Sequence, residues 1–346
     1  MFFGWTPLGS ELRRGDRTLK VVATEKIPTL PEANIAPLSS VPFKLAYQTK
    51  WGKMYQGTAE HIENKKRLAK LKGKVRLILT SPPFPLNRKK RYGNLQGEEY
   101  IKWLAGLAPL FKELLEPRGS IAMEIGNAWE PGEPVMSPLA LEALLAFLKS
   151  GDFKLCEQFV CYNKATLPGP TEWVNVRRIR VKNAYTHVWW MSPSAFPLAN
   201  NRRVLTPYTD AMKDLLRTKK YNAGERHSEH VIGKTSFLKD NGGAIPSNVI
   251  EFTNTRSSDP YLDYCRESGF DVHPARMAMN VADFFVKFLS TPGKLILDPF
   301  AGSNVTGAAA EQRGRRWLSI EPQLDYIEAS RGRFPTLRGR HGRPKE

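Results

Sequence analysis

The chain has 346 residues, of which 41% are hydrophobic and 10% are aromatic, which suffices for a packed core and excludes a disordered protein. No apolar stretch approaches the ~20 residues that a membrane-spanning helix needs, and the short apolar start soon meets charged residues, so we expect a cytoplasmic protein without a membrane partner. Lysine and arginine exceed aspartate and glutamate by 52 − 34 = 18, and this excess favours a polyanionic partner.

The cysteines and histidines predict neither a disulfide framework nor a metal site. Cys156, Cys161 and Cys265 form an odd, sparse set without a second pair of ligands, so we expect buried, reduced thiols. His227 and His230 are three residues apart but lie in a polar, turn-rich stretch that is typical of a surface loop.

Residues 1–44 carry scattered prolines and little periodicity, and we expect an N-terminal arm there. From residue 45 on, apolar runs of strand length alternate with stretches of helical spacing. The predicted strands are 53–56, 75–79, 120–126, 153–162, 184–191, 294–297 and 316–321. The predicted helices are 58–71, 99–115, 139–148, 274–289, 305–313 and 324–331. This alternation predicts an α/β fold with a parallel, doubly wound sheet.

The regularity fails between residues 192 and 271, which are rich in proline, glycine and asparagine and show one clear helix, at 208–216. Such a stretch is typical of an inserted, loop-rich region built for contact.

The positive charge is gathered in four clusters. The first leads into the strand at 75–79 and the second follows it, as a groove that contacts phosphates would require. The clusters are Lys65 to Arg76, Arg88-Lys89-Lys90-Arg91, Arg177 to Lys182, and a tail that starts near Arg331.

The strand at 75–79 ends abruptly in Thr80-Ser81-Pro82-Pro83-Phe84. A hydroxyl, a proline carbonyl and an aromatic ring thus meet at the carboxyl end of a strand, the edge where open α/β sheets bind ligands. Ser81 and the Pro82 carbonyl could accept the N–H hydrogens of a planar amino-bearing base while Phe84 stacks on its ring. The alternative is an ordinary Ser-Pro-Pro turn.

A second motif, Asp298-Pro-Phe-Ala-Gly302, lies where another strand turns into a helix, and Glu321 ends the next strand 321 − 302 = 19 residues later. This matches the acidic residue that binds ribose hydroxyls in nucleotide-type units. Ala308 stands where a P-loop needs lysine, and Asn304 stands where a dinucleotide loop needs glycine. A ligand with ribose and no phosphate, S-adenosylmethionine, fits better than a nucleotide, although a tight turn without a ligand is the alternative.

Together the two motifs resemble the amino-group DNA methyltransferases, and the Ser81 form is typical of their cytosine-N4 branch, since the adenine-N6 branch usually carries aspartate there. The resemblance runs from about residue 54 to 334. The stretches 87–94, 172–182, 233–246 and 273–276 are similar to PvuII-type members in particular.

This resemblance implies a Rossmann-like class I methyltransferase sheet in circularly permuted order. The catalytic half would occupy 45–191, the target-recognition region 192–271 and the cofactor half 272–334, followed by a basic tail at 335–346. It implies S-adenosylmethionine as cofactor, double-stranded DNA as partner, and methyl transfer to N4 of a flipped cytosine. A cognate restriction endonuclease is left open as a functional rather than physical partner.

The site residues expected from the motifs, the charge clusters and the resemblance fall into three groups. The catalytic residues are Ser81, Pro82, Pro83 and Phe84, with Tyr162-Asn163-Lys164 as a candidate second wall of the base pocket. The cofactor-binding residues are His273, Pro274, Ala275, Asp298, Phe300, Gly302, Ser303, Asn304 and Glu321. The DNA-binding residues are Arg88, Lys89, Lys90, Arg91, Arg177, Arg178, Arg180, Lys182, Lys234, Lys239 and Asn241. Adenine-N6 methylation and a non-catalytic DNA-binding protein stay open as rivals.

Overall fold

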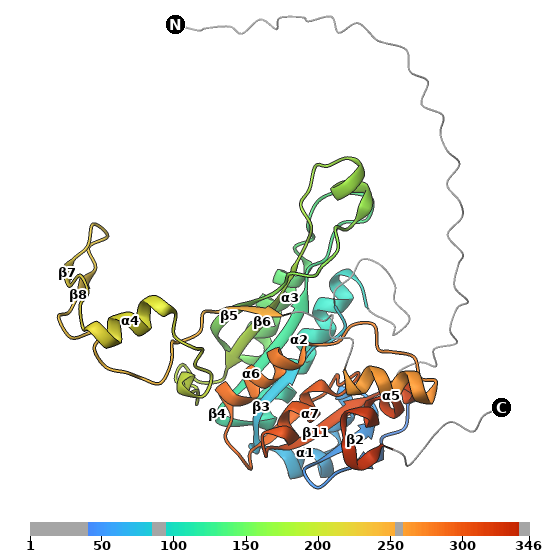
Figure 1. Ribbon diagram of the computed structural model, residues 1–346. Helices are drawn as coiled ribbons and strands as arrows, with labels where there is room; N and C mark the ends of the chain where they lie inside the picture. Colours follow the sequence, from blue (N-terminus) through green and yellow to red (C-terminus); the bar gives the residue numbers. More distant parts are fainter. Residues whose placement is uncertain (1–40, 85–94, 253–258, 339–346) are drawn as a thin grey trace, which may run out of the picture. The chain divides into compact units, whose positions relative to one another are not determined.

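A nine-stranded sheet organises the chain (Figure 1), for which the computed structural model describes residues 41–84, 95–252 and 259–338. Its order is β1-β2-β11-β10-β3-β4-β6-β5-β9. The strands are β1 Lys44–Gln48, β2 Gly52–Gln56, β3 Val75–Thr80, β4 Leu115–Gly126, β5 Lys154–Asn163, β6 Tyr185–Ser192, β9 Val249–Phe252, β10 Leu295–Asp298 and β11 Arg316–Glu321.

The central strands are parallel: β2 pairs with β11, β11 with β10, β10 with β3 and β3 with β4. The sheet is not parallel throughout, because β6 runs antiparallel to both β4 and β5, and β1 runs antiparallel to β2. The segment between β5 and β6 returns as a hairpin instead of crossing the sheet, so no parallel pairing of these two strands follows. The predicted α/β sheet is confirmed as mainly parallel.

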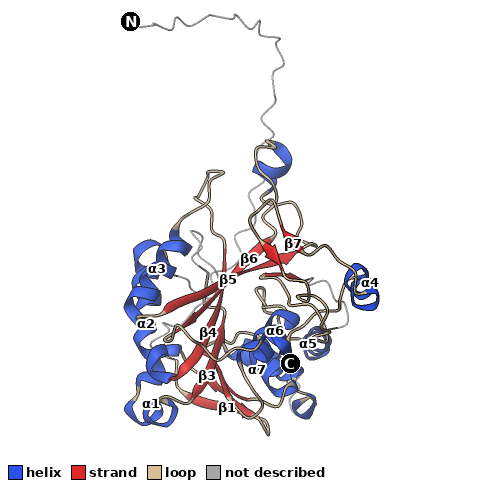
Figure 2. Cartoon of the chain, turned by 90° about the vertical axis from the view of Figure 1, so that its left-hand side faces the viewer, coloured by secondary structure: helices blue, strands red, loops and turns tan. Residues whose placement is uncertain are grey.

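Helices cover both faces of the sheet (Figure 2). The helices α2 Gly97–Leu114 and α3 Leu139–Gly151 pack with Ile78 and Ile121 in one core, whereas α6 Met279–Leu289 and α7 Val305–Gln312 pack with Leu77 and Leu79 in the other. Every residue of β3 is buried. A strand buried on both faces needs a nearly continuous apolar run, and Val75 to Leu79, interrupted only by Arg76, was recognisable in the sequence for this reason.

Several elements differ from the prediction. The stretch 58–71 is not one helix but a 3-10 turn, Ala59–Glu63, and a short helix, α1 Lys65–Leu71, because the Asn64 side chain accepts from the Lys66 amide and starts a new helix. Helix α6 begins at Met279 rather than 274. Helix α5 Pro260–Ser268 was missed, as were β1 and β9; it packs against α8 Leu324–Ser330.

The inserted region forms a small module of its own, seen at the left of Figure 1. It holds α4 Asp210–Thr218 and a two-stranded ribbon of β7 Gly224–Glu225 and β8 Val231–Ile232. Thr206 and Ala244 close its neck through two backbone hydrogen bonds of 2.9 Å. Since α4 has no buried residue, this helix is exposed to solvent on all sides.

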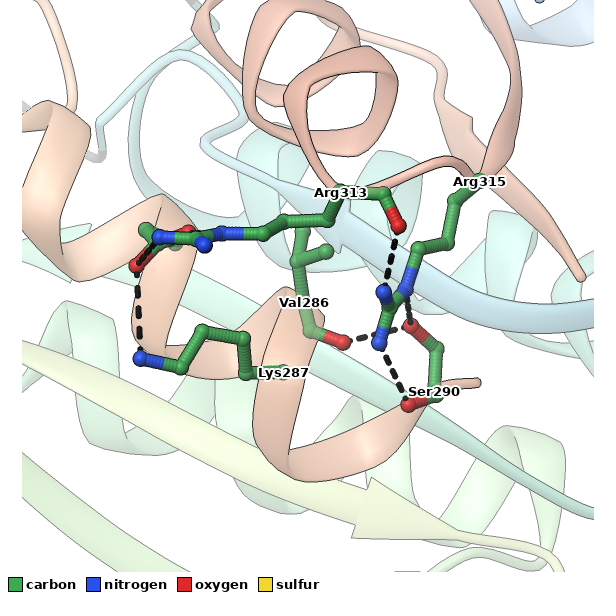
Figure 3. A network of polar contacts seen from close by, with 6 residues as sticks. Val286, Lys287, Ser290, Arg313 and Arg315 are labelled. Carbon is green, nitrogen blue, oxygen red and sulfur yellow. Dashed lines mark hydrogen bonds and ion pairs between the residues drawn. The ribbon is translucent and has the colours of Figure 1, made fainter. Parts of the chain in front are cut away.

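Arg315 joins the end of α6 to the strand β11 through one hydroxyl and two carbonyl oxygens (Figure 3). Its buried guanidinium donates to the Ser290 hydroxyl at 3.1 Å, the Ser290 carbonyl at 3.0 Å and the Arg313 carbonyl at 2.5 Å. The Ser290 carbonyl also accepts from Arg203, which leads into the inserted module. Burial lowers the pKa of Arg315, and the last carbonyls of a helix compensate a cation well.

No helix in the described ranges is long and apolar enough to cross a bilayer. The same ranges contain no cluster of three or more histidine, cysteine or acidic side chains placed to share a metal ion. Cys161 and Cys265 are buried free thiols, and Cys156 is half-buried.

Candidate active site

Two adjoining cavities open at the edge where β3, β10, β11 and β4 end. The larger cavity, of about 710 Å³, is lined by the segments that follow β3, β10 and β11. The smaller cavity, of about 260 Å³, is lined by residues of β4, β5 and β6. Ser81 and Phe84 line both cavities, as do Ala275, Arg276 and Met277. The first motif therefore forms part of the boundary between the two.

A buried carboxylate ties the two predicted motifs together. Asp298 accepts from the Thr80 hydroxyl at 2.7 Å and from the Phe300 amide at 3.1 Å. Burial raises its pKa to about 6. Thr80 and Asp298 are 218 residues apart in the chain, so this bond fixes the end of β3 against the loop after β10. The two motifs share one cleft.

Glu321 ends β11 with its carboxylate on the wall of the larger cavity. Its two oxygens accept from the Gly302 amide at 2.8 Å and from the Gln323 amide at 3.0 Å. Burial raises its pKa to about 7. Each oxygen retains an acceptor site that a ligand hydroxyl could use.

Gly302 needs to be glycine for two reasons. Its φ of +48° lies in the left-handed region, and a Cβ atom there would lie 2.9 Å from Nε2 of His273. The His273 ring packs edge-on against Tyr326 with 4.3 Å between centroids, and burial lowers the pKa of His273 to about 4. His273 is therefore neutral at pH 7.

Asn304 does not line either cavity, which corrects its expected place against the cofactor. Its fully buried amide caps α7 by accepting from the Gly307 amide at 3.1 Å, accepts from the Ser319 hydroxyl at 2.7 Å and donates to Tyr47 at 3.0 Å. Asn304 therefore holds the loop in place from behind.

The other predicted cofactor residues lie at the cavities. His273, Ala275, Asp298, Phe300, Gly302, Ser303 and Glu321 line the larger cavity, and Pro274 lines the smaller one. Phe300 meets Trp103 edge-to-face at 5.5 Å between centroids, which gives the larger cavity an apolar wall suited to a flat ring.

The predicted catalytic residues meet at the junction. Pro82 and Pro83 line the larger cavity, and the Ser81 hydroxyl donates to the Glu124 carbonyl at 3.4 Å. The Phe84 ring lies directly against Gly126, where a Cβ atom would come within 2.5 Å of two ring carbons. Of the candidate stretch 162–164, only Asn163 lines the smaller cavity.

Glu124 is a site residue that the sequence analysis missed. It lies in β4, lines the smaller cavity with Ser81 and accepts from the Thr186 hydroxyl at 2.9 Å. Burial raises its pKa to about 7. The available signal was a lone carboxylate within the apolar run at 120–126.

Two predicted DNA-binding groups lie on projecting segments. Residues 164–184 form an arm that rises from the smaller cavity, the green excursion at the top of Figure 1, and it carries Arg177, Arg178, Arg180 and Lys182. Lys234, Lys239 and Asn241 are exposed on the inserted module. Arg88, Lys89, Lys90 and Arg91 lie outside the described residues.

The first basic cluster does not flank the site, contrary to expectation. Lys74 directly precedes β3 and so lies at the opposite edge of the sheet, where its ammonium donates to the Lys70 carbonyl. Arg76 is buried in an ion pair with Glu116. In the fourth cluster, Arg331 and Arg333 are held inside the fold by Glu328 and by the Ser303 carbonyl. Net charge along the sequence did not reveal which cations were already paired.

Comparison with known proteins agrees with this arrangement. Residues 75–331 match the family model described as DNA methylase (N6_N4_Mtase). The type II methyltransferase M.PvuII of Proteus hauseri is 41% identical over 294 residues, which cover 84% of this chain and 86% of that protein. The type II methyltransferase M.BglII of Bacillus subtilis is 22% identical over 259 residues, 73% of this chain and 62% of that protein. The solved structure of the cytosine-N4-specific PvuII DNA methyltransferase covers 85% of this chain and 90% of its own, with 34% identity and a TM-score of 0.67.

Proposed function

The chain belongs to the DNA methylase family (N6_N4_Mtase), and from this premise we propose that it transfers a methyl group from S-adenosylmethionine to the exocyclic N4 of cytosine in double-stranded DNA. The observation that carries the proposal is the meeting of Ser81 with the loop after Asp298 at one pair of adjoining cavities. The role we propose is modification of a specific site, either beside a restriction endonuclease or alone.

The larger cavity suits S-adenosylmethionine. Its volume lies in the usual range for small-molecule sites. Glu321 would accept from the ribose hydroxyls, and Phe300 with Trp103 would flank the adenine. Ser303, Ala275 and the neutral His273 line the same cavity, and we assign the methionine end to them.

The smaller cavity suits a base turned out of the duplex. Ser81 and the Pro82 carbonyl would accept the N4 hydrogens while Phe84 stacks on the ring. Accepting these hydrogens directs the nitrogen lone pair toward the larger cavity, so orientation supplies much of the acceleration, ~7–11 kcal/mol in favourable cases.

When bound, the cofactor would supply an electrophilic methyl group on its sulfonium, and transfer of that group to N4 would leave one N4 proton to be taken up. Glu124 lies in the same cavity as Ser81, and burial raises its pKa to about 7. It is therefore the carboxylate suited to take up that proton at neutral pH.

We place DNA across the arm and the inserted module, on Arg177, Arg178, Arg180, Lys182, Lys234, Lys239 and Asn241, with Arg88 to Arg91 as further contacts. In this proposal the catalytic half spans 45–191, target recognition 192–271 and the cofactor half 272–334, a circularly permuted order. It is supported by Ser81 lying before the inserted module in the chain and Asp298 after it, although both lie at one edge of the sheet. Neutralising cations on the arm should weaken DNA binding and reduce its salt dependence.

Adenine-N6 methylation by the same fold is the rival within the family, since the family model covers both activities. Cytosine-N4 is favoured by serine rather than aspartate at position 81 and by the cytosine-N4-specific PvuII structure. A non-catalytic DNA-binding protein predicts no methyl incorporation into DNA.

The test is Ser81→Ala, with Ser150→Ala as matched control, because Ser150 is an exposed serine near the end of α3. Transfer of labelled methyl to duplex DNA should fall at least about 100-fold for Ser81→Ala, since an acceptor for the amine is lost. Cofactor affinity measured by calorimetry should stay unchanged. Wild-type transfer by the Ser81→Ala protein would refute the assignment.

A further inference from the structure

The arm at 164–184 carries the two most exposed large apolar side chains among the residues described. Leu167 is 82% exposed and Val181 is 86% exposed. Val176 and Ile179, which are 66% and 59% exposed, extend this apolar surface along the arm. Exposed apolar side chains gathered on one projecting segment mark a contact surface rather than a scatter of surface residues.

Leu167 and Val181 lie on opposite limbs of the arm, beside the mouth of the smaller cavity. Thr166 and Asn183 line that cavity, one residue before Leu167 and two residues after Val181. The ammonium of Lys182 spans the limbs and donates to the Thr166 carbonyl at 3.0 Å. The two limbs that carry Leu167 and Val181 are thus held together beside the cavity that a base would enter.

Two side-chain contacts brace the arm. The Arg180 guanidinium stacks over the Trp129 ring at 3.1 Å, which fixes one limb to the loop after β4. Arg177 pairs with Glu172 at 2.6 Å within the tip. The stretch 172–182 has four cations and one anion, a net charge of +3. An apolar edge set among cations fits a polyanion with an apolar interior.

We propose that Leu167 and Val181 form a wedge that enters the base stack of duplex DNA and fills the space left by the base that moves into the smaller cavity. This inference rests on the proposed function and extends it to residues that touch neither the cofactor nor the transferred methyl group. Apolar wedges of this kind offset the cost of unstacking, which is a few kcal/mol per step. The wedge acts on the paired, stacked base, so its effect disappears when the target base is already unpaired.

The test compares the wild-type chain, the double variant Leu167→Ala/Val181→Ala and the control Phe196→Ala. Phe196 is 77% exposed and follows β6 at the opposite edge of the sheet, so it matches in exposure but not in place. Each protein methylates a duplex whose target cytosine is paired with guanine, and the same duplex with that cytosine mispaired. The target is first located by methylation-sensitive sequencing of DNA from cells that express the chain.

The double variant should lose about 10- to 100-fold in kcat/KM on the paired duplex and recover to within about threefold of wild type on the mispaired one. Phe196→Ala should match wild type on both. Equal losses on the two duplexes, or no loss on the paired one, would overturn the wedge while leaving the proposed function intact. Absence of methyl transfer by the wild-type chain would refute the proposed function and the wedge with it.

Discussion

Gly126→Ala should displace the stacking ring of Phe84 while leaving the cofactor residues Phe300 and Glu321 in place. Gly126 ends β4, where it is held by pairing with Thr186 of β6. An added methyl group would lie 2.5 Å from Cδ2 and Cε2 of Phe84, whereas carbon atoms in contact are about 3.5–4.0 Å apart. Pairing with β6 holds β4 in place, whereas the Phe84 ring borders both cavities. The ring rather than the strand should therefore move, by about 1 Å or more.

With the ring displaced, the target base should lose its stacking on Phe84, which is worth about 1–3 kcal/mol. That corresponds to a fall of about 10- to 100-fold in kcat/KM for DNA. The free energy of unfolding should fall by less than the 1–3 kcal/mol typical of overpacking, because the half-exposed ring can move aside. Affinity for S-adenosylmethionine should be unchanged.

The assay pairs steady-state methyl transfer with cofactor calorimetry and thermal unfolding. Gly106→Ala in α2 is the matched control, since nothing lies within 4 Å of its added methyl group and alanine favours a helix by about 1 kcal/mol. It should raise the unfolding temperature and leave transfer intact. A Gly126→Ala protein with wild-type kcat/KM would show that the position of Phe84 does not matter.

Three further predictions concern buried charges. Burial holds the pKa of Glu124 at about 7, above its value of 4.5 when exposed, so its folded form favours the proton and wild-type stability should fall as the pH rises from about 5 to 8. Glu124→Gln should remove this pH-dependent loss of unfolding free energy, which is worth up to about 3 kcal/mol at pH 8 and vanishes below pH 4.5. The same substitution should slow methyl transfer about 100-fold or more. Equal pH profiles of unfolding for the two proteins would contradict the raised pKa of Glu124. Glu321→Gln should weaken S-adenosylmethionine binding about 10- to 100-fold, because the backbone amide of Gly302 or of Gln323 loses its acceptor. An unchanged affinity in calorimetry would argue against Glu321 as a cofactor-binding residue. Arg315→Ala should lower the free energy of unfolding in urea by about 2–4 kcal/mol, because the buried oxygens of Ser290 lose their donor. Arg313 is more exposed, so Arg313→Ala should lower it by less than about 1.5 kcal/mol. Equal losses for the two variants would contradict a special role for the buried acceptors.

The elements that could be predicted from the sequence are those whose pattern is local. The buried run of β3 and the turn at Gly302 were recognisable because continuous burial and a left-handed backbone restrict the residues allowed. Helix α5 also had a local signal, an Asp259 cap, a proline in the first turn and Gly269 at the end, which the irregular surroundings obscured.

The missed features depend on partners far away in the chain. The short edge strand β9 exists through pairing with β5, which nothing in its own four residues specifies. Asn304 appeared to be a ligand contact, yet Tyr47 and Ser319 engage its amide from distant segments. In the sequence, Glu124 is one residue of a buried strand, and only residues of β5 and β6 complete the cavity that it lines. Pairing and burial of polar groups are properties of the assembled fold, so spacing alone could not assign them.

The base held at Ser81 should be a cytosine whose exocyclic nitrogen receives the methyl group. Duplex DNA treated with the purified chain and S-adenosylmethionine should be digested to nucleosides and analysed by mass spectrometry. We expect N4-methylcytosine, at a level that falls to background with the Ser81→Ala protein. N6-methyladenine in its place, or no methylated nucleoside at all, would contradict this claim.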